Sequence, residues 1–250
     1  MLSLSIITVT YNASETLPDC LKSIAKQGIN VEHIIIDGAS TDATMEIIDA
    51  HKEQLAHIVS EPDEGIYDAM NKGLKLARGD VIGILNADDF YPSDDTLEKV
   101  LAVFDDPDIE VCYGDLVYVN DQNTDKVVRF WRSDNFDLNR FYWGWMPPHP
   151  TFFVRRSVYE RYGFFNQELG SAADYEVMLR FLLRYQVKVA YIPEVLVHMR
   201  TGGVSNVSLR NRLKANQMDR MAWKVNGLRP YPWTLWAKPL RKLKQWMVKK

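Results

Sequence analysis

Two kinds of hydrophobic pattern follow one another along the first half of the chain. Short apolar, β-branched runs such as Leu4–Val9 and Val31–Asp37 are typical of buried parallel strands. Between these runs apolar residues recur every three or four positions, as at Leu17, Leu21 and Ile24, which predicts helices. The predicted strands cover 4–9, 31–37, 58–60, 81–85 and 110–113, and the predicted helices begin near 17, 43, 68 and 97. This alternation predicts an α/β fold, with a mostly parallel, Rossmann-like sheet flanked by helices.

The pattern changes after residue 115. A hairpin is predicted over 116–131, then an aromatic, proline-bearing loop over 141–150. Further strands are expected at 151–154, 187–192 and 195–199, and further helices at 157–162, 174–185 and 209–224. We interpret residues 1–205 as one domain with a donor half at about 1–115 and an acceptor half at about 116–205. Residues 206–250 form a C-terminal helical extension that ends in a basic amphipathic tail.

Composition narrows the class of protein. The 250 residues are 46% hydrophobic and 25% charged, which is ordinary for a globular protein with a large core. The two cysteines, Cys20 and Cys112, are too few for a disulfide framework or a zinc site, so we expect them in the core. The first residues lack signal-peptide features, and no apolar run approaches the ~20 residues of a membrane span. We therefore expect a cytoplasmic protein.

Charge is distributed unevenly along the chain. The net charge is −3, yet residues 229–250 carry seven basic and no acidic residues. On a helical wheel Trp236, Leu240, Leu243 and Met247 share one face of this segment, with basic residues around it. Two interpretations are open: a helix docked on the body, or an interfacial helix on an anionic leaflet. We favour the second, with the 234–250 tail holding the protein at the inner face of the cytoplasmic membrane.

Polar residues follow three of the predicted strands directly. They are Thr10–Asn12, Asp37–Gly38 and Asn86–Asp89. Ligands of open α/β sheets bind beyond the carboxyl ends of the strands, so these side chains are candidates for one site. Adjacent carboxylates at a strand end suit Mg²⁺ or Mn²⁺, and such a metal would neutralise a departing diphosphate. A turn that caps the next helix explains the same residues equally well.

Two further segments carry weaker signals. Asp37 precedes a turn glycine and could accept an N–H from a nucleobase, although an Asx-turn is an equal alternative. Gly65 can let the backbone approach a ligand. Lys72 could contact a phosphate as a point charge, but a solvated surface is the commoner place for a helix lysine.

Taken in order, these segments resemble glycosyltransferase family 2, the inverting enzymes of the GT-A fold. The resemblance covers residues 3 to about 205 and is much more specific than any one of its motifs. The matching segments are Ser5–Asn12, Ile36–Asp42, Ala69–Gly73, Ala77–Asp80, Leu85–Asp89 and Ala173–Glu176. It implies transfer of a sugar from a nucleotide diphosphate sugar, with UDP as the expected nucleotide, to a hydroxyl of a glycan or lipid-linked acceptor.

The resemblance also implies donor-side roles. Tyr11 and Asp37 would hold the base, with Thr10 beside them. Asn86 and Asp88 match the first and last positions of the family's Asp-x-Asp motif, with Ala87 between them. Asp88 would bind Mn²⁺ or Mg²⁺; because Asn86 replaces the usual aspartate, we expect weaker metal affinity. Further candidate metal ligands are Asp89 and His198.

On the acceptor side the resemblance assigns Asp174 as the general base that deprotonates the incoming hydroxyl. Family members often carry Glu-Asp where this chain has Ala173-Asp174. A purely structural role as a helix cap is the alternative, and the two roles are compatible. The other acceptor-side candidates are His149, Trp145 and Arg200, the last also as a partner for diphosphate charge.

Two other functions remain as alternatives. A nucleotidyltransferase shares strand-end carboxylates but usually carries a glycine-rich, basic loop after the first strand, where this chain has Thr10-Tyr11-Asn12-Ala13. A non-catalytic sugar- or nucleotide-binding relative would explain Asn86 and Ala173. A dinucleotide dehydrogenase is excluded because no G-x-G-x-x-G follows the first strand. We expect no nucleic-acid partner.

Overall fold

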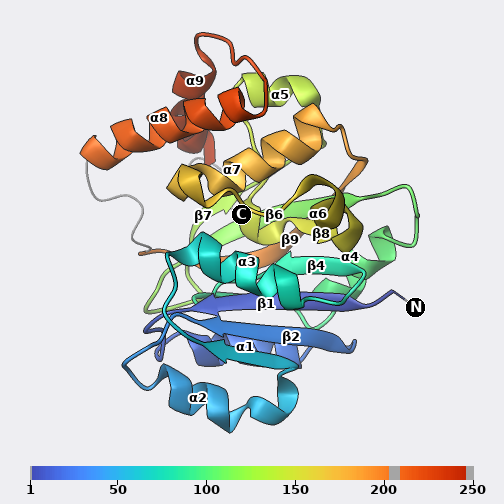
Figure 1. Cartoon of the computed structure of the whole chain (residues 1–250), viewed down its shortest axis with the longest axis vertical. Helices are drawn as coiled ribbons and strands as arrows, with labels where there is room; N and C mark the ends of the chain where they lie inside the picture. The colour runs from blue at the N-terminus through green and yellow to red at the C-terminus, as the bar shows by residue number, and fades with distance from the viewer. Residues whose placement is uncertain (1, 203–208, 246–250) are drawn as a thin grey trace.

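A nine-stranded sheet organises residues 2–202 and 209–245, the part of the chain that the computed structural model describes (Figure 1). The strand order is β3-β2-β1-β4-β8-β6-β9-β5, and β7 pairs with β6 off this path. The strands are β1 (Leu4–Thr10), β2 (Val31–Asp37), β3 (His57–Ser60), β4 (Val81–Ile84), β5 (Asp89–Phe90), β6 (Val111–Val119), β7 (Val127–Trp131), β8 (Phe153–Arg155) and β9 (Val189–Arg200). The predicted α/β class is confirmed.

The donor half of the sheet is parallel. Strands β2 and β4 flank β1, β3 flanks β2, and all four run the same way. In this register Thr10 lies opposite Asp37, and Asp37 lies opposite Ser60. The polar residues that end these strands therefore share one edge of the sheet, as predicted.

Helices cover both faces of the sheet, because the strands are apolar on both sides. In β1, Ile7 and Val9 join a cluster with Met70 of α3, while Leu4 and Ile6 join a cluster on the opposite face. The helices are α1 (Leu17–Ala25), α2 (Thr44–Ala50), α3 (Ile66–Leu76), α4 (Thr96–Val103), α5 (Leu138–Tyr142), α6 (Arg156–Tyr162), α7 (Ala173–Met178), α8 (Leu209–Val225) and α9 (Thr234–Gln245). Both cysteines are buried and free, as expected.

Two predicted strand pairs are single strands in the structure. The predicted strand at 110–113 and the first strand of the predicted hairpin merge into β6, and the predicted strands at 187–192 and 195–199 merge into β9, which runs parallel to β6. The register steps from Gly114 opposite Ile192 to Asp115 opposite Val195, so two residues of β9 bulge out. A Cβ at Gly114 would lie 2.4 Å from the Leu196 side chain, and glycine therefore permits the close pairing. The interruption in the hydrophobic pattern marks this bulge.

Helix starts differ from the prediction at two places. Helix α1 follows Thr16, whose side chain makes no capping hydrogen bond among the described residues, although serine, at Ser14, is the commoner capping residue type. Helix α7 begins at Ala173, so Asp174 lies in its first turn and is not its cap. After Met178 the backbone winds into a π-helical segment, Leu179–Arg184, which sequence periodicity did not indicate. Asp174 is therefore not the residue that caps this helix, which was the structural alternative given for it.

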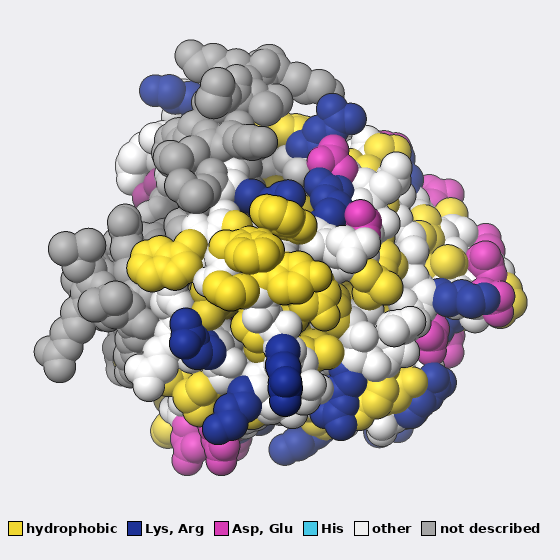
Figure 2. Space-filling model, turned by 90° about the horizontal axis from the view of Figure 1, so that it is seen from above, with side chains coloured by type: hydrophobic (Ala, Val, Ile, Leu, Met, Phe, Trp, Pro, Cys, Tyr) yellow, Lys and Arg dark blue, Asp and Glu magenta, His cyan; other side chains and the backbone are white. Residues whose placement is uncertain are grey.

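The C-terminal extension packs on the body of the protein. Trp223 of α8 is fully buried, and its Nε1 donates to the Tyr175 hydroxyl at 2.9 Å. Lys238 of α9 contacts Asp219 at 2.8 Å, and its Nζ lies 3.7 Å from the centre of the Tyr175 ring. Helices α8 and α9 thereby lie beside α5 and α7 at one end of the molecule, the end seen face-on in Figure 2.

These contacts bear on the predicted membrane tail. Lys238 and Arg241 bind groups of the body, and Leu235 is buried, so the start of α9 is a docked helix. Trp236 is 67% exposed. The predicted lipid-facing side chains of Leu240, Leu243 and Met247 lie outside the part of the chain whose side chains are described. Among the helices of the described residues, none is long and apolar enough to cross a bilayer.

Candidate active site

The donor side of the site lies where β1, β2 and β4 end. Leu85 N donates to Ile7 O and Ala87 N to Val9 O, so the segment after β4 continues alongside β1. Thr10 and Asn86 are thereby brought to the same edge. Thr10 Oγ1 and Asn86 Oδ1 are buried and have no hydrogen-bond partner among the described residues. Such atoms are costly unless a ligand satisfies them, which fits a donor-binding role for both.

Tyr11 presents a stacking surface at this edge. Its ring is 63% exposed, and it borders Gly38. A Cβ at Gly38 would lie 2.6 Å from Asp63 Oδ2 and 3.4 Å from Tyr11, so a larger residue there would have to displace the Asp63 carboxylate. Asp63, which sequence reasoning missed, therefore lines the same region. Its position in an acidic loop directly after β3 was the available signal.

Asp37 is fully buried in the turn that follows β2. Its oxygens accept from Ser40 N at 3.0 Å, from the Ser40 hydroxyl, and from Ser60 Oγ at 2.7 Å. The turn that was offered as an alternative therefore accounts for this carboxylate. A carboxylate has about four acceptor positions, and three of those of Asp37 are used, so about one remains to accept an N–H from a nucleobase.

Lys72 does not project toward a phosphate position. Its Nζ lies 2.8 Å from Glu61, 3.2 Å from Asp68 and 3.1 Å from Pro62 O, and these partners raise its pKa. The three ammonium donors thereby hold the loop before α3, so this geometry does not support the predicted phosphate contact, which stays a prediction. Gly65 starts α3 with φ +117 and has open space at its Cβ position, as a backbone approach to a ligand requires.

Asp88 is the carboxylate best placed for a metal. Burial raises its pKa, and the nearby charges of Arg200 and His149 oppose that rise. A buried carboxylate of this kind is stabilised in its charged form by a divalent cation. The oxygen chemistry of Asp88 and Asn86 fits Mg²⁺ or Mn²⁺.

Asp89 and His198 do not complete a ligand set with Asp88. Asp89 is fully buried, its two oxygens have no partner among the described residues, and burial raises its pKa well above the usual range. His198 packs edge-on against Phe90 at 5.2 Å, and burial lowers its pKa. The described residues contain no group of three or more acidic, histidine or cysteine side chains that could hold a metal. Substrate oxygens would have to supply most of the coordination.

Asp174 is linked to this cluster through His149. His149 Nδ1 is 3.5 Å from Asp174 Oδ2, and the same imidazole interacts electrostatically with Asp88. Tyr67, at the start of α3, also hydrogen-bonds with Asp174, whose charge adds to burial in raising the tyrosine pKa. Sequence reasoning missed Tyr67. His149 thus interacts with both carboxylates, and their meeting in one catalytic cleft stays a prediction.

Two acceptor-side predictions need revision. Trp145 is only 4% exposed, and its Nε1 donates to Ser133 O at 2.9 Å within an aromatic core, so it cannot stack on a sugar. Trp143, two residues earlier, is the exposed ring of this loop, at 53%. Arg200 lies beside Asp88 rather than in the acceptor loop. Its Nη1 donates to Asp88 O at 3.1 Å, and its Nη2 binds the Asp19 carboxylate.

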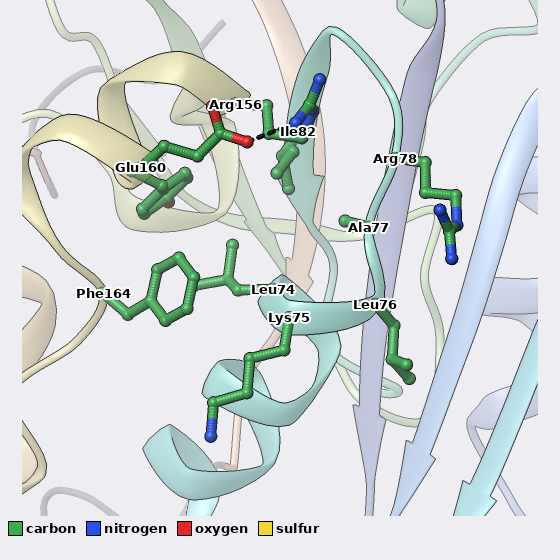
Figure 3. Close-up of a pocket in the computed structure, with 10 residues that line it drawn as sticks. Leu74, Lys75, Leu76, Ala77, Arg78, Ile82, Arg156, Glu160 and Phe164 are labelled. Atoms are coloured by element: carbon green, nitrogen blue, oxygen red, sulfur yellow. Dashed lines mark hydrogen bonds and ion pairs between the residues drawn. The ribbon is translucent and has the colours of Figure 1, made fainter.

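A separate cavity of about 470 Å³ lies between α3 and α6 (Figure 3). Leu74, Ile82 and Phe164 line it, and the Arg156–Glu160 ion pair lies at its border. Ile82 lies near the start of β4, far along the sheet from Asp88 and Asn86. This cavity is therefore not part of the donor site.

Comparison with known proteins agrees with the geometry. Residues 5–163 match the model of glycosyl transferase family 2. A PGL/p-HBAD biosynthesis glycosyltransferase of Mycobacterium bovis is 32% identical over 208 residues, covering 81% of this chain and 78% of that protein. Chondroitin synthase of Escherichia coli is 29% identical over 189 residues, covering 70% of this chain but 26% of the larger enzyme.

Solved structures share the fold. S. aureus TarS 1-349 in complex with UDP-GlcNAc superposes with a TM-score of 0.70 at 19% identity, covering 92% of this chain and 68% of that one. The mannosyltransferase PcManGT from Pyrobaculum calidifontis, in complex with GDP-Man and Mn²⁺, gives 0.66 at 20% identity, covering 95% and 72%. In the UDP complex of TarS 1-349 the chain spans slightly less than two thirds of its neighbour, 65%. At these identities the likeness establishes the GT-A fold alone.

Proposed function

Because this chain belongs to glycosyl transferase family 2 and is a glycosyltransferase, we propose that it transfers a sugar from a nucleoside diphosphate sugar to a hydroxyl with inversion of configuration. UDP is the expected nucleotide, and the acceptor is a hydroxyl of a glycan or a lipid-linked glycan. One observation carries the proposal: His149 lies 3.5 Å from Asp174 and also interacts electrostatically with Asp88, which supports a shared site for the two carboxylates.

Asp174 acts as the general base in this proposal. The acceptor oxygen attacks the anomeric carbon while its proton passes to the Asp174 carboxylate, and the bond from that carbon to the diphosphate oxygen breaks. The nucleoside diphosphate leaves on the opposite side, so no covalent enzyme intermediate forms. His149 and Tyr67 both contact Asp174 and hold its carboxylate toward the cleft.

The donor would lie along the strand ends. Tyr11 offers a ring for the base, and Thr10 and Asn86 offer oxygens without protein partners. Asp88 would hold Mn²⁺ or Mg²⁺ together with diphosphate oxygens, and the bound cation supplies positive charge beside the leaving group. The Mn²⁺ and GDP-Man in the PcManGT complex support this assignment by analogy of fold.

We further propose that the enzyme works at the inner face of the cytoplasmic membrane, with the basic 234–250 segment near anionic lipid. The excess of basic over acidic residues in 229–250 supports this location. The docking of Lys238 and Arg241 on the body means that these two cations contribute less to it than the sequence indicated.

Donor hydrolysis tests the function directly. Purified protein would be incubated with a panel of UDP- and GDP-linked sugars and Mn²⁺, and released nucleotide measured. We expect release from one donor class, loss of release on chelation and its recovery when Mn²⁺ is restored. Release from no donor, combined with absent nucleotide binding, would favour the non-catalytic alternative.

A further inference from the structure

An aromatic surface lies on the end of the molecule formed by α5, α8 and α9. Its members are large, exposed side chains from segments about ninety residues apart in sequence: Trp143, Tyr231, Trp233 and Trp236. The rings touch one another, with Trp143–Trp233 centroids 5.6 Å apart and Tyr231–Trp233 centroids 5.1 Å apart. Figure 2 shows hydrophobic side chains gathered on this face with lysines and arginines around them.

The fold holds this aromatic surface in a fixed arrangement. Thr234 Oγ1 donates to Tyr142 O at 2.6 Å, and Arg241 Nε donates to Trp143 O at 2.9 Å. Gly144 has φ +75, and a Cβ there would lie 2.3 Å from Lys238 N, so α9 sits directly against this loop. The rings are therefore exposed although the backbone beside them is fixed by hydrogen bonds. An exposed apolar surface of this kind often marks a binding site for a protein or a membrane.

We infer that this aromatic surface docks on an anionic lipid bilayer and presents a lipid-linked acceptor to the cleft. Tryptophan and tyrosine concentrate at the level of lipid headgroups, where an amphipathic ring contacts both apolar and polar matter. The charge nearest the rings comes from Arg241, which donates to Trp143 O, and from Arg140, which also pairs with Asp134 at 2.9 Å, while residues 229–250 contain no acid. This proposed lipid-facing surface combines residues of two segments, whereas the sequence predicted a single face of the helix within 234–250.

The surface is also close to the catalytic side chains along the chain. Trp143 and His149 are six positions apart, which bounds the distance between their Cα atoms at about 22 Å. Trp145, between them, is anchored in the core through Ser133 O. A headgroup bound at the aromatic surface would therefore place its glycan within reach of Asp174. The identity of the acceptor depends on the proposed function, whereas bilayer binding does not.

Vesicle flotation tests the surface. The full chain would be mixed with vesicles of phosphatidylcholine alone or of phosphatidylcholine and phosphatidylglycerol in equal parts. We expect binding to the anionic vesicles, and a loss of about tenfold in the partition coefficient for each of Trp233→Ser and Trp236→Ser. Val127→Ser, an equally exposed apolar position outside the surface, is the matched control and should bind as the wild type does.

Three results would overturn the inference. The first is wild-type protein that does not float with anionic vesicles. The second is Trp233→Ser/Trp236→Ser protein that floats like the wild type while keeping its native circular dichroism. The third is a wild-type dimer in light scattering that the double variant converts to monomer, since the surface would then join two copies. Donor hydrolysis without vesicles, measured in parallel, should be unchanged in the double variant; its absence from the wild type would count against the proposed function alone.

Discussion

The donor half and the acceptor half of this enzyme differ in how their candidate site residues are positioned. In the donor half each strand delivers its functional residues locally: β1 ends at Thr10, β2 at Asp37, and β4 leads to Asn86 and Asp88. In the acceptor half the proposed base, Asp174, belongs to a short helix that distant segments contact. Trp223 donates to the Tyr175 hydroxyl and Lys238 lies over the Tyr175 ring, and both come some fifty to sixty residues further along the chain. The donor-side residues are thus local in sequence, whereas the placement of the proposed base depends on distant segments.

Substitution of the base should have the largest effect. Asp174→Asn removes the proton acceptor but preserves size, so we expect the transfer rate to fall by about 10²–10⁴-fold. Binding of UDP, measured by calorimetry, should remain within twofold or so of the wild type because the donor half is untouched. Asp49→Asn, an exposed carboxylate on α2, serves as the matched control. Substantial turnover by the Asp174 variant would remove this residue as the base.

His149 is expected to matter next. It contacts Asp174 and faces Asp88, so His149→Gln should lower kcat by about tenfold to a hundredfold while KM for the donor changes little. Steady-state kinetics at saturating Mn²⁺ would measure both. His57→Gln changes a partly exposed imidazole on β3 and should leave the rate unaltered. Equal kinetics for the two variants would show that the interactions of His149 with Asp174 and Asp88 do not affect the transfer rate.

The dependence on distant segments can be tested at Lys238. Lys238→Met removes the ammonium that lies 2.8 Å from the largely buried Asp219, which we expect to lower the free energy of unfolding by about 1–3 kcal/mol. Because Lys238 also lies on the Tyr175 ring, the transfer rate should fall more than UDP affinity. Lys224→Met, on the exposed side of α8, is the control. An unchanged melting temperature and rate would show that α9 does not support the base.

Lys72 distinguishes a local ion-pair role from a phosphate role. Lys72→Met should change UDP affinity by less than about threefold, because the ammonium is engaged with Glu61 and Asp68 rather than directed at the donor. Lys75→Met, on the same helix, provides the comparison. A tenfold or greater loss of UDP affinity confined to the Lys72 variant would restore the phosphate contact predicted from the sequence.

A buried histidine in the donor half gives a test by stability rather than by activity. Burial lowers the pKa of His33 to about 3, and its Nε2 lies 3.0 Å from Thr8 Oγ1. The unfolded chain takes up a proton near pH 6.5 that the folded protein excludes, so stability should be lost as pH falls below that value. His33→Gln cannot titrate, and between pH 7 and pH 5 we expect it to lose about 2 kcal/mol less than the wild type in urea unfolding. Parallel losses in both proteins would contradict this.

The sequence predicted the donor half well because its signals are short-range. The continuous apolar runs of β1 and β2 and the polar residues at the strand ends are properties of neighbouring positions. Lys72 and Trp145 have partners that the sequence did not indicate: Glu61 and Asp68 for the lysine, and a buried aromatic cluster for the tryptophan. Tyr67 was missed because its significance comes from Asp174, more than a hundred residues away. The bulge opposite Gly114 and the π-helical segment after Met178 likewise arise from packing between distant elements.

The contact between Lys238 and the Tyr175 ring also affects when the enzyme can first act. Domains begin to fold during synthesis, from the amino terminus onward, so the nucleotide-binding strands can form early. The ribosome must pass residue 238 before the support beside Asp174 exists. A polypeptide still being translated would therefore hold nucleotide sugar before it could consume it, and prematurely terminated products would remain catalytically silent.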